Sequence, residues 1–371
     1  MKSVSRSSML SKKDGKKPMI PLFKPYMPAG IEEPLRDVLY SGKLAFGANG
    51  RAFEQALNAY LGTENAVVVN SFGSAMEVVL DVYGIGAGSE VIMSPMTCLR
   101  SSQPIACRGA QVVWADIDPD FGVVSPESVR EKITSHTKLI INYHHLGYVG
   151  FCDEINRIGA EFGIPVLEDC LDGIGGEYRG KKVGTLGDAA VISFDAVRLP
   201  NAIEGGAVVF RDAEKAAVAR LKRDLGVDRK HYRDENNEIY PGCDISMTGY
   251  ACTMSDVNAL VALKQMPELD SLLDHRHRNA KRWAELLAGR RDCRMLGVVP
   301  ETLPNHWVAG ILTDRKIDLM REFRDKGVYA SGVHLQNNHY SVFENHEVLP
   351  GVEDFYRRFL ALPTGWWCDI K

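Results

Sequence analysis

Short apolar segments alternate with longer amphipathic segments through the first two thirds of this sequence. Seven segments have the length and the β-branched composition of strands: Ala66–Asn70, Glu90–Met93, Gln111–Asp116, Lys138–Tyr143, Pro165–Glu168, Ala189–Phe194 and Ala207–Phe210. Several are almost entirely apolar, which is typical of strands covered by helices on both faces. The pattern predicts an α/β domain with a mostly parallel sheet, whose sites form at the carboxyl ends of the strands.

The segments between and after these strands predict helices and a second unit. Amphipathic helices are expected at Ala75–Tyr83, Leu99–Arg108, Ser125–Ile133 and Cys152–Phe162. The stretch from Met254 to Leu287 predicts one long helical connector, and the polar segment Asp224–Cys243 predicts a long loop. Candidate strands of a smaller α+β unit lie near His306–Leu312 and Val328–His334. We therefore expect a flexible arm at 1–19, a large α/β domain at 20–265 and a small C-terminal domain at 266–371.

Composition and charge narrow the class of protein. The chain has 371 residues, a formal net charge of −4 and no run of about 18 apolar residues. We therefore expect no membrane span, and nothing in the overall charge attracts nucleic acid. The eight cysteines show no zinc-binding spacing, so we expect no metal site and reduced thiols in the cytoplasm.

Residues with chemical potential follow three of the predicted strands. The small-residue turn Ser71–Ala75 opens a helix and could bind a phosphate or simply cap that helix. Glu168 and Asp169 are adjacent carboxylates that could bind a metal, serve as acid and base, pair with a cationic ring nitrogen, or have a structural role. Ser193 could donate its hydroxyl to a phosphate. No glycine-rich dinucleotide or Walker motif occurs, which argues against a dehydrogenase or an NTPase.

Several short motifs occur one after another along the chain: Val112–Pro119, His145–Gly147, Glu168–Asp169, Gly175–Gly184, Ser193–Phe194, Glu204–Gly206, Met254–Asp256 and Leu362–Pro363. In order and spacing they resemble the DegT/DnrJ/EryC1/StrS family of sugar aminotransferases, over about Ile20 to Pro363. The resemblance implies an α/β fold of the fold-type I pyridoxal phosphate (PLP) transferases. Such a fold has a large domain with a seven-stranded, mostly parallel sheet and a smaller α+β C-terminal domain.

The resemblance also implies roles for individual residues. Asp169 would face the pyridine nitrogen of PLP or of its amine form, PMP. Ser193 and the backbone amides of Gly73 and Ser74 would hold the cofactor phosphate, and His334 would contact the substrate. The family works as a homodimer and commonly moves an amino group from glutamate to a keto sugar attached to a nucleotide.

The chain departs from the family pattern at the position that matters most for catalysis. Arg198 stands where the family has the lysine that forms a Schiff base with PLP. The pKa of an arginine guanidinium lies far above 7, so a neutral nucleophile at this position would cost roughly 9 kcal/mol at pH 7. Cys98 replaces the aromatic residue that stacks on the ring, Asp172 replaces a common glutamine, and Gly73 replaces the usual threonine of the phosphate turn. We therefore expect any cofactor to be bound without a covalent link.

Three hypotheses remain open at this point. The first is an enzyme of sugar or natural-product biosynthesis that still uses PLP or PMP, including a PMP-dependent enzyme of the dehydratase type. The second is an inactive homologue that binds a sugar nucleotide or a partner protein without PLP. The third is an altered enzyme that binds an anionic substrate through Arg198 without PLP.

Overall fold

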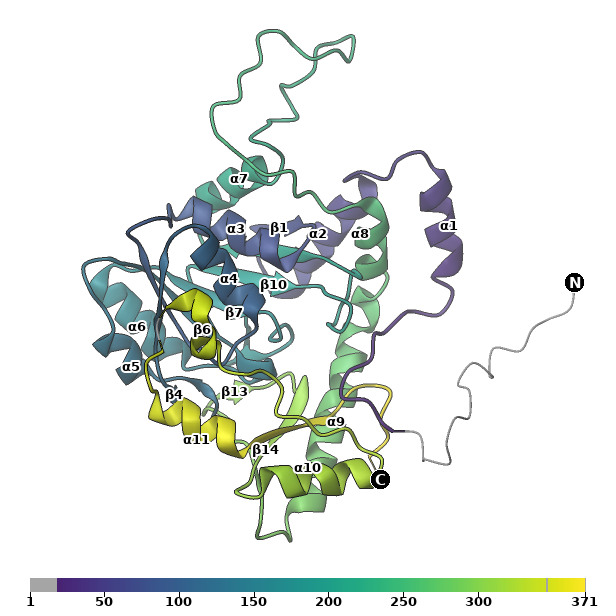
Figure 1. The fold of residues 1–371 in the computed structure, drawn as a ribbon. Helices are drawn as coiled ribbons and strands as arrows, with labels where there is room; N and C mark the ends of the chain where they lie inside the picture. The colour runs from purple at the N-terminus through teal and green to yellow at the C-terminus, as the bar shows by residue number, and fades with distance from the viewer. Residues whose placement is uncertain (1–18, 345, 371) are drawn as a thin grey trace, which may run out of the picture.

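A seven-stranded sheet forms the centre of the protein (Figure 1). The computed structural model describes residues 19–344 and 346–370, so most of the predicted N-terminal arm lies outside the described residues. The strands of this sheet, in spatial order, are β1 (Ala66–Val69), β11 (Gly206–Phe210), β10 (Ala189–Ser193), β7 (Val166–Cys170), β6 (Thr137–Tyr143), β2 (Glu90–Met93) and β3 (Gln111–Trp114). All seven predicted strands are present, and the predicted fold class is confirmed.

The strand directions bring three chain segments together at one end of the sheet. β11 runs antiparallel to both β1 and β10, whereas all the other pairs in the sheet are parallel. Gly206, the first residue of β11, pairs with Val69 on one side and with Ser193 on the other. The carboxyl ends of β1 and β10 therefore lie on either side of the same residue.

Helices cover both faces of the sheet, and alternation along the strands assigns side chains to one face or the other. One face packs against α3 (Phe72–Val82), α4 (Leu99–Cys107) and α7 (Ala213–Lys222). The other face packs against α2 (Ala48–Leu61), α5 (Pro126–Glu131), α6 (Cys152–Phe162) and α8 (Asp256–Leu263). In β7, Leu167 belongs to the first core and Val166 to the second.

The predicted connector from Met254 to Leu287 is not one helix. Helix α8 ends at Leu263, a 3₁₀ turn spans Met266–Glu268, and α9 covers Leu269–Leu287. The prediction of one continuous helix was wrong because Pro267 has no backbone N–H to continue the hydrogen-bond ladder.

The C-terminal part has its own small sheet and core. Its sheet consists of β12 (Arg294–Met295), β14 (Val308–Leu312) and β15 (Phe359–Pro363), packed with α9 and α10 (Lys316–Asp325). The predicted strand Val328–His334 was wrong: only single bridges form at Val328 and Ser331, and Val333 has a positive φ of 41°. The pairing position beside β14 is taken instead by β15. The domain boundary near residue 265 stays a prediction.

The remaining helices and strands of the described chain are α1 (Glu32–Tyr40), α11 (Pro350–Arg358), β4 (Ile117–Asp118), β5 (Val123–Val124), β8 (Glu177–Tyr178), β9 (Lys181–Lys182) and β13 (Thr302–Leu303), and further 3₁₀ turns span His145–Gly147, Asn337–His339 and Ser341–Phe343. The predicted loop Asp224–Cys243 is confirmed, and it projects from the molecule above α7 (Figure 1). Across 19–344 and 346–370, no helix combines the length and apolarity needed to cross a bilayer.

The close approach of Gly206 to the turn after β1 gives a test of this architecture. A Cβ at Gly206 would lie 2.6 Å from the carbonyl oxygen of Ser71 and 2.9 Å from the backbone nitrogen of Phe72. Because both neighbours are backbone atoms, we expect G206A to lower the free energy of unfolding by about 1–3 kcal/mol in urea titrations. The matched control is G289A, since a Cβ at Gly289 meets no atom within 4 Å. Equal stability of the two variants would contradict the tight packing described here.

Candidate functional site

The adjacent carboxylates at the end of β7 point to opposite faces of the sheet. Glu168 and Asp169 are both almost completely buried. Strand alternation sends Glu168 toward the side of α6 and α8 and Asp169 toward the side of α3 and α4. The two carboxylates therefore do not form an acid–base pair or bind one ion together.

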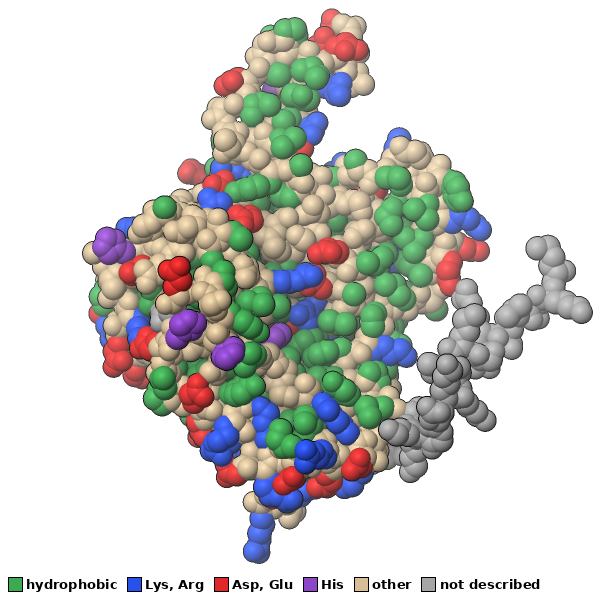
Figure 2. Space-filling model, in the orientation of Figure 1, with side chains coloured by type: hydrophobic (Ala, Val, Ile, Leu, Met, Phe, Trp, Pro, Cys, Tyr) green, Lys and Arg blue, Asp and Glu red, His purple; other side chains and the backbone are tan. Residues whose placement is uncertain are grey.

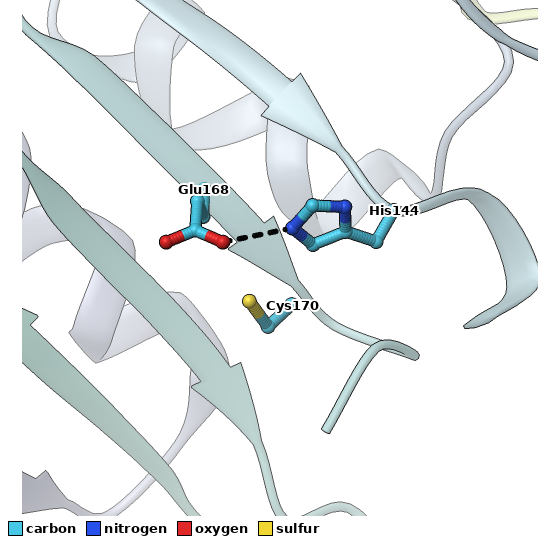
Figure 3. A group of neighbouring side chains, drawn as sticks. All are labelled: His144, Glu168 and Cys170. Carbon is cyan, nitrogen blue, oxygen red and sulfur yellow. Dashed lines mark hydrogen bonds and ion pairs between the residues drawn. The ribbon is translucent and has the colours of Figure 1, made fainter. Parts of the chain in front are cut away.

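Glu168 has a structural role: it binds the connection between β9 and β10. Its Oε1 accepts hydrogen bonds from the backbone amides of Leu186 and Gly187 at 2.6 and 2.8 Å, and its Oε2 accepts one from Gly184 at 3.0 Å. The Nε2 of His144 lies 3.0 Å from the same Oε2 (Figure 3). Glu168 thereby fastens the β9–β10 connection to the end of β7.

The same residues form a cluster with Cys170 that has the composition of a metal site (Figure 3). The backbone amide of Gly150 donates to Nδ1 of His144 at 3.1 Å, so the hydrogen of the neutral ring sits on Nε2 and points to Glu168. A metal would need that nitrogen without its proton, and burial raises the pKa of the Cys170 thiol well above its usual value. The cluster is a satisfied hydrogen-bond network.

Asp169 is the carboxylate that is free to meet a ligand. Its Oδ1 accepts the backbone amide of Leu171 at 3.0 Å, whereas its Oδ2 is buried and has no hydrogen-bond partner among the described residues. Burial raises the pKa of this carboxyl to about 6, although the neighbouring Ser101 and the Leu171 amide oppose the rise. A buried carboxylate oxygen without a donor suits a cationic N–H group such as a protonated pyridine.

The turn after β1 is a capped helix start. Ser71 is the N-cap of α3, and its Oγ accepts the backbone amide of Ser74 at 3.0 Å. The Ser74 amide, predicted to hold a phosphate, is therefore already bonded inside the turn. Beside Gly73 there is open space, because the nearest atom to a Cβ built there would be Ser71 Oγ at 3.8 Å. The positive end of the α3 dipole still favours an anion at this place.

Ser193 lies across Gly206 from this turn, at the end of β10. It is fully buried, and its Oγ accepts the backbone amide of Asp195 at 3.3 Å. Since a hydroxyl can accept and donate at once, its own hydrogen can point to another acceptor. The turn and Ser193 together suit a phosphate group, as the sequence predicts.

Arg198 forms a buried ion pair with Asp172. Its Nη2 lies 2.9 Å from Oδ1 of Asp172, close enough for an ion pair but without hydrogen-bond geometry, and the two side chains are 9% and 0% exposed. The guanidinium also stacks on Trp307, with Cζ 4.2 Å from the ring centroid. The Nε and Nη1 groups of Arg198 are buried and have no partner among the described residues.

Further groups fix Asp172 from the other side. The hydroxyl of Tyr143 donates to Oδ2 of Asp172, and the side chain of Asn305 donates to its backbone carbonyl. Trp307 is held by its own Nε1, which donates to the carbonyl of Val197 at 3.2 Å. The sequence did not reveal a role for Tyr143, Asn305 or Trp307. Only Tyr143 could have been found there, because it is the last residue of a predicted strand.

The structure also brings Cys98 and His334 to this place. Cys98 is the half-buried N-cap of α4, and burial raises the pKa of its thiol, with Asp172 and Arg198 among the charges that act on it. Burial lowers the pKa of His334, on which the same two charges act, and its Nε2 has no partner among the described residues.

None of the strongest charges around this site belongs to a lysine. Among the described residues, the charges that act most on Asp169, Tyr143, Cys98 and His334 come from Asp169, Asp172, Arg198 and His144. Lys181 and Lys182 form β9 of the β8–β9 hairpin. We predict that no other residue binds PLP covalently in place of a lysine at position 198, and this stays a prediction.

Comparisons with known proteins assign the chain to a family. The model of the DegT/DnrJ/EryC1/StrS aminotransferase family matches residues 26–366. Among solved structures, AtS13 from Actinomadura melliaura is 28% identical with a TM-score of 0.89, and each chain is 95% covered. The sugar aminotransferase CalS13 from Micromonospora echinospora is 27% identical with a TM-score of 0.88, covering 95% of this chain and 96% of that one. The aminotransferase TlmJ from Streptoalloteichus hindustanus is 26% identical with a TM-score of 0.87, and each chain is 95% covered. The resemblance found in the sequence is confirmed, and the chain belongs to the DegT/DnrJ/EryC1/StrS aminotransferase family of transferase enzymes.

Proposed function

We propose that this protein is a sugar aminotransferase homologue that binds PLP or PMP without a covalent link. Its substrate in this proposal is a keto sugar, in nucleotide-linked form or as a related natural-product precursor, and the working form is a cytoplasmic homodimer. Family membership supports the class of enzyme. The observation that carries the non-covalent part is the buried ion pair between Arg198 and Asp172.

The residues around the site fit such a cofactor. Asp169 would accept the hydrogen of the ring nitrogen on its free Oδ2, while Ser193 and the start of α3 would hold the phosphate. Cys98 would lie beside the ring. When bound, the cofactor supplies a protonated ring that withdraws electrons from the carbon next to the amino group.

Arg198 cannot do the work of the family's lysine. A guanidinium keeps its proton at every physiological pH, so it neither attacks a carbonyl carbon nor accepts a proton there. Its contacts with Asp172 and Trp307 instead hold a fixed positive charge next to the substrate space. His334 is the nearby group able to accept a proton, because burial keeps its ring neutral at pH 7 and its Nε2 is unpartnered among the described residues.

The first test concerns the carboxyl of Asp169. Its pKa rises from 3.8 to about 6 on folding, so between these values the folded chain binds more protons and stability falls as the pH rises. Above pH 6 the full cost remains, and a shift of about two units corresponds to about 3 kcal/mol. We expect D169N to raise the free energy of unfolding of the cofactor-free protein by about 1–3 kcal/mol at pH 7, with little gain near pH 4.

The same substitution should weaken PLP and PMP binding by about tenfold or more, since a neutral amide cannot form the charge-assisted hydrogen bond with a protonated ring nitrogen. Urea titrations and fluorescence titrations with each cofactor measure the two effects. D318N, which changes an exposed carboxylate on α10, is the control. A D169N variant that loses stability at pH 7, or that binds both cofactors as the natural chain does, would contradict the proposed role.

The second test restores the family's residues at the ion pair. In the R198K/D172Q variant a primary amine replaces the guanidinium, and the opposing charge is removed with it. We expect borohydride reduction after PLP binding to leave the cofactor attached at position 198 of this variant and to leave no cofactor on the corresponding peptide of the natural chain. Peptide mapping by mass spectrometry gives the answer.

The outcome also separates the proposed function from its alternative. If the natural chain carries PLP on one of its own lysines within the site, non-covalent binding is wrong. If neither cofactor binds the natural chain at all, the proposed function is wrong, and the alternative is a cofactor-free homologue, for which binding of a sugar nucleotide is the next measurement.

A further inference from the structure

A second buried arginine, Arg276, forms no ion pair of its own with any residue that the structure describes. It lies on α9 and is 3% exposed, and its Nε is buried without a hydrogen-bond partner among the described residues. Burial lowers the pKa of this guanidinium to about 9, with the positive charge of Arg198 acting in the same direction and Asp172 opposing both. At pH 7 it therefore still carries its charge.

The packing of α9 places Arg276 close to the segment that follows β7. Leu273 lies one helical turn before Arg276, on the same face of the helix. Leu273 packs so closely on Gly175 that a Cβ there would lie 2.5 Å from Leu273 Cδ1. Gly175 belongs to the segment after β7 that also carries Asp172. The two arginines thus approach one carboxylate from different parts of the chain.

The charges of this group do not balance. Asp172 neutralises one of the two guanidiniums, and burial holds His334 in its neutral form. The other nearby carboxylate, Asp169, is the counter-charge of the protonated ring nitrogen in the proposed function, so it does not neutralise the second guanidinium once the cofactor is bound. One positive charge is left over, and Nε and Nη1 of Arg198 and Nε of Arg276 lack acceptors among the described residues. Buried donors and charges without partners are costly, so a site of this kind is completed by a ligand that brings both acceptors and charge. Figure 2 shows Lys and Arg side chains near the middle of the view, between the positions that α4 and α9 have in Figure 1.

We propose that Arg198 and Arg276 together bind a carboxylate group of the substrate. The inference deepens the proposed function, since it names the chemistry that this same site recognises. A carboxylate brings one negative charge, which matches the one positive charge left over, and two oxygens that suit the planar guanidinium fork. A phosphate dianion would leave a net negative charge in the same buried space. The carboxylate belongs either to a sugar acid or to the amino acid that donates nitrogen.

The stacking of Arg198 on Trp307 supports a recognition role. Trp307 is itself stacked on Phe23, with ring centroids 4.0 Å apart. The guanidinium is therefore held in one plane before a ligand arrives, which lowers the entropy cost of binding. If Arg198 had only a structural role, the counter-charge of Asp172 would be sufficient for it. A structural role would not explain why the guanidinium of Arg276 also acts on this group.

The test compares matched acidic and neutral ligands on the full chain. Calorimetric titrations use UDP-glucuronate against UDP-glucose for the sugar source, and L-glutamate against L-glutamine for the donor source, with and without PMP. We expect one acidic member to bind at least tenfold more tightly than its neutral partner. We expect R276Q to weaken that member alone by about 10- to 100-fold. R276K retains the positive charge but lacks the planar guanidinium. Its affinity for the acidic ligand should therefore lie between those of the natural chain and R276Q.

Controls make each outcome decisive. R211Q changes an exposed arginine at the opposite end of β11 and should bind every ligand as the natural chain does. PMP affinity measured in R276Q should stay unchanged, so that loss of the carboxylate site is distinct from loss of the cofactor. If both pairs bind without preference for the acid, if inorganic phosphate displaces the acid at equal concentration, or if R276Q binds the acid normally, the inference is overturned. If the natural chain binds the acid but binds neither PLP nor PMP, the carboxylate site is supported and the proposed aminotransferase function is wrong.

Discussion

The buried ion pair between Arg198 and Asp172 is the interaction on which the rest of the site depends. A permanent charge that is 9% exposed needs a partner, because moving an unpaired ion out of water costs several kcal/mol. Asp172 supplies that partner, and Tyr143 and Asn305 hold Asp172 in place. The two residues that the sequence predicts as departures from the family pattern therefore form one ion pair.

The sheet decides which of the neighbouring carboxylates can meet a ligand. Because side chains alternate along β7, Glu168 fastens the β9–β10 connection on one side, while on the other side Oδ2 of Asp169 has no hydrogen-bond partner among the described residues. The pairing of Gly206 with both Val69 and Ser193 then sets the helix start of α3 beside the end of β10. Strand order and register therefore bring together Asp169, Ser193 and the start of α3, the groups proposed to hold the cofactor ring and its phosphate.

The sequence predicted the sheet well because its strands are short, apolar and covered on both sides. The approximate bounds of all seven strands and the fold class followed from that pattern. The C-terminal unit was less predictable: Val333 has a left-handed backbone that no local pattern signals, and β15 pairs with a strand almost fifty residues earlier. Asp169, Asp172 and Arg198 were identified from family motifs. Trp307 and Arg276 were not, because their importance comes from tertiary packing around Arg198.

The most direct measurement of the central claim is a double-mutant cycle on this ion pair, with R198Q, D172N and the double variant followed by urea unfolding. If the two residues compensate each other, each single variant loses about 3–5 kcal/mol because it strands a buried charge, and the double variant loses much less than their sum. Losses that add without coupling would show that the two substitutions are unrelated, and would contradict this account of the site.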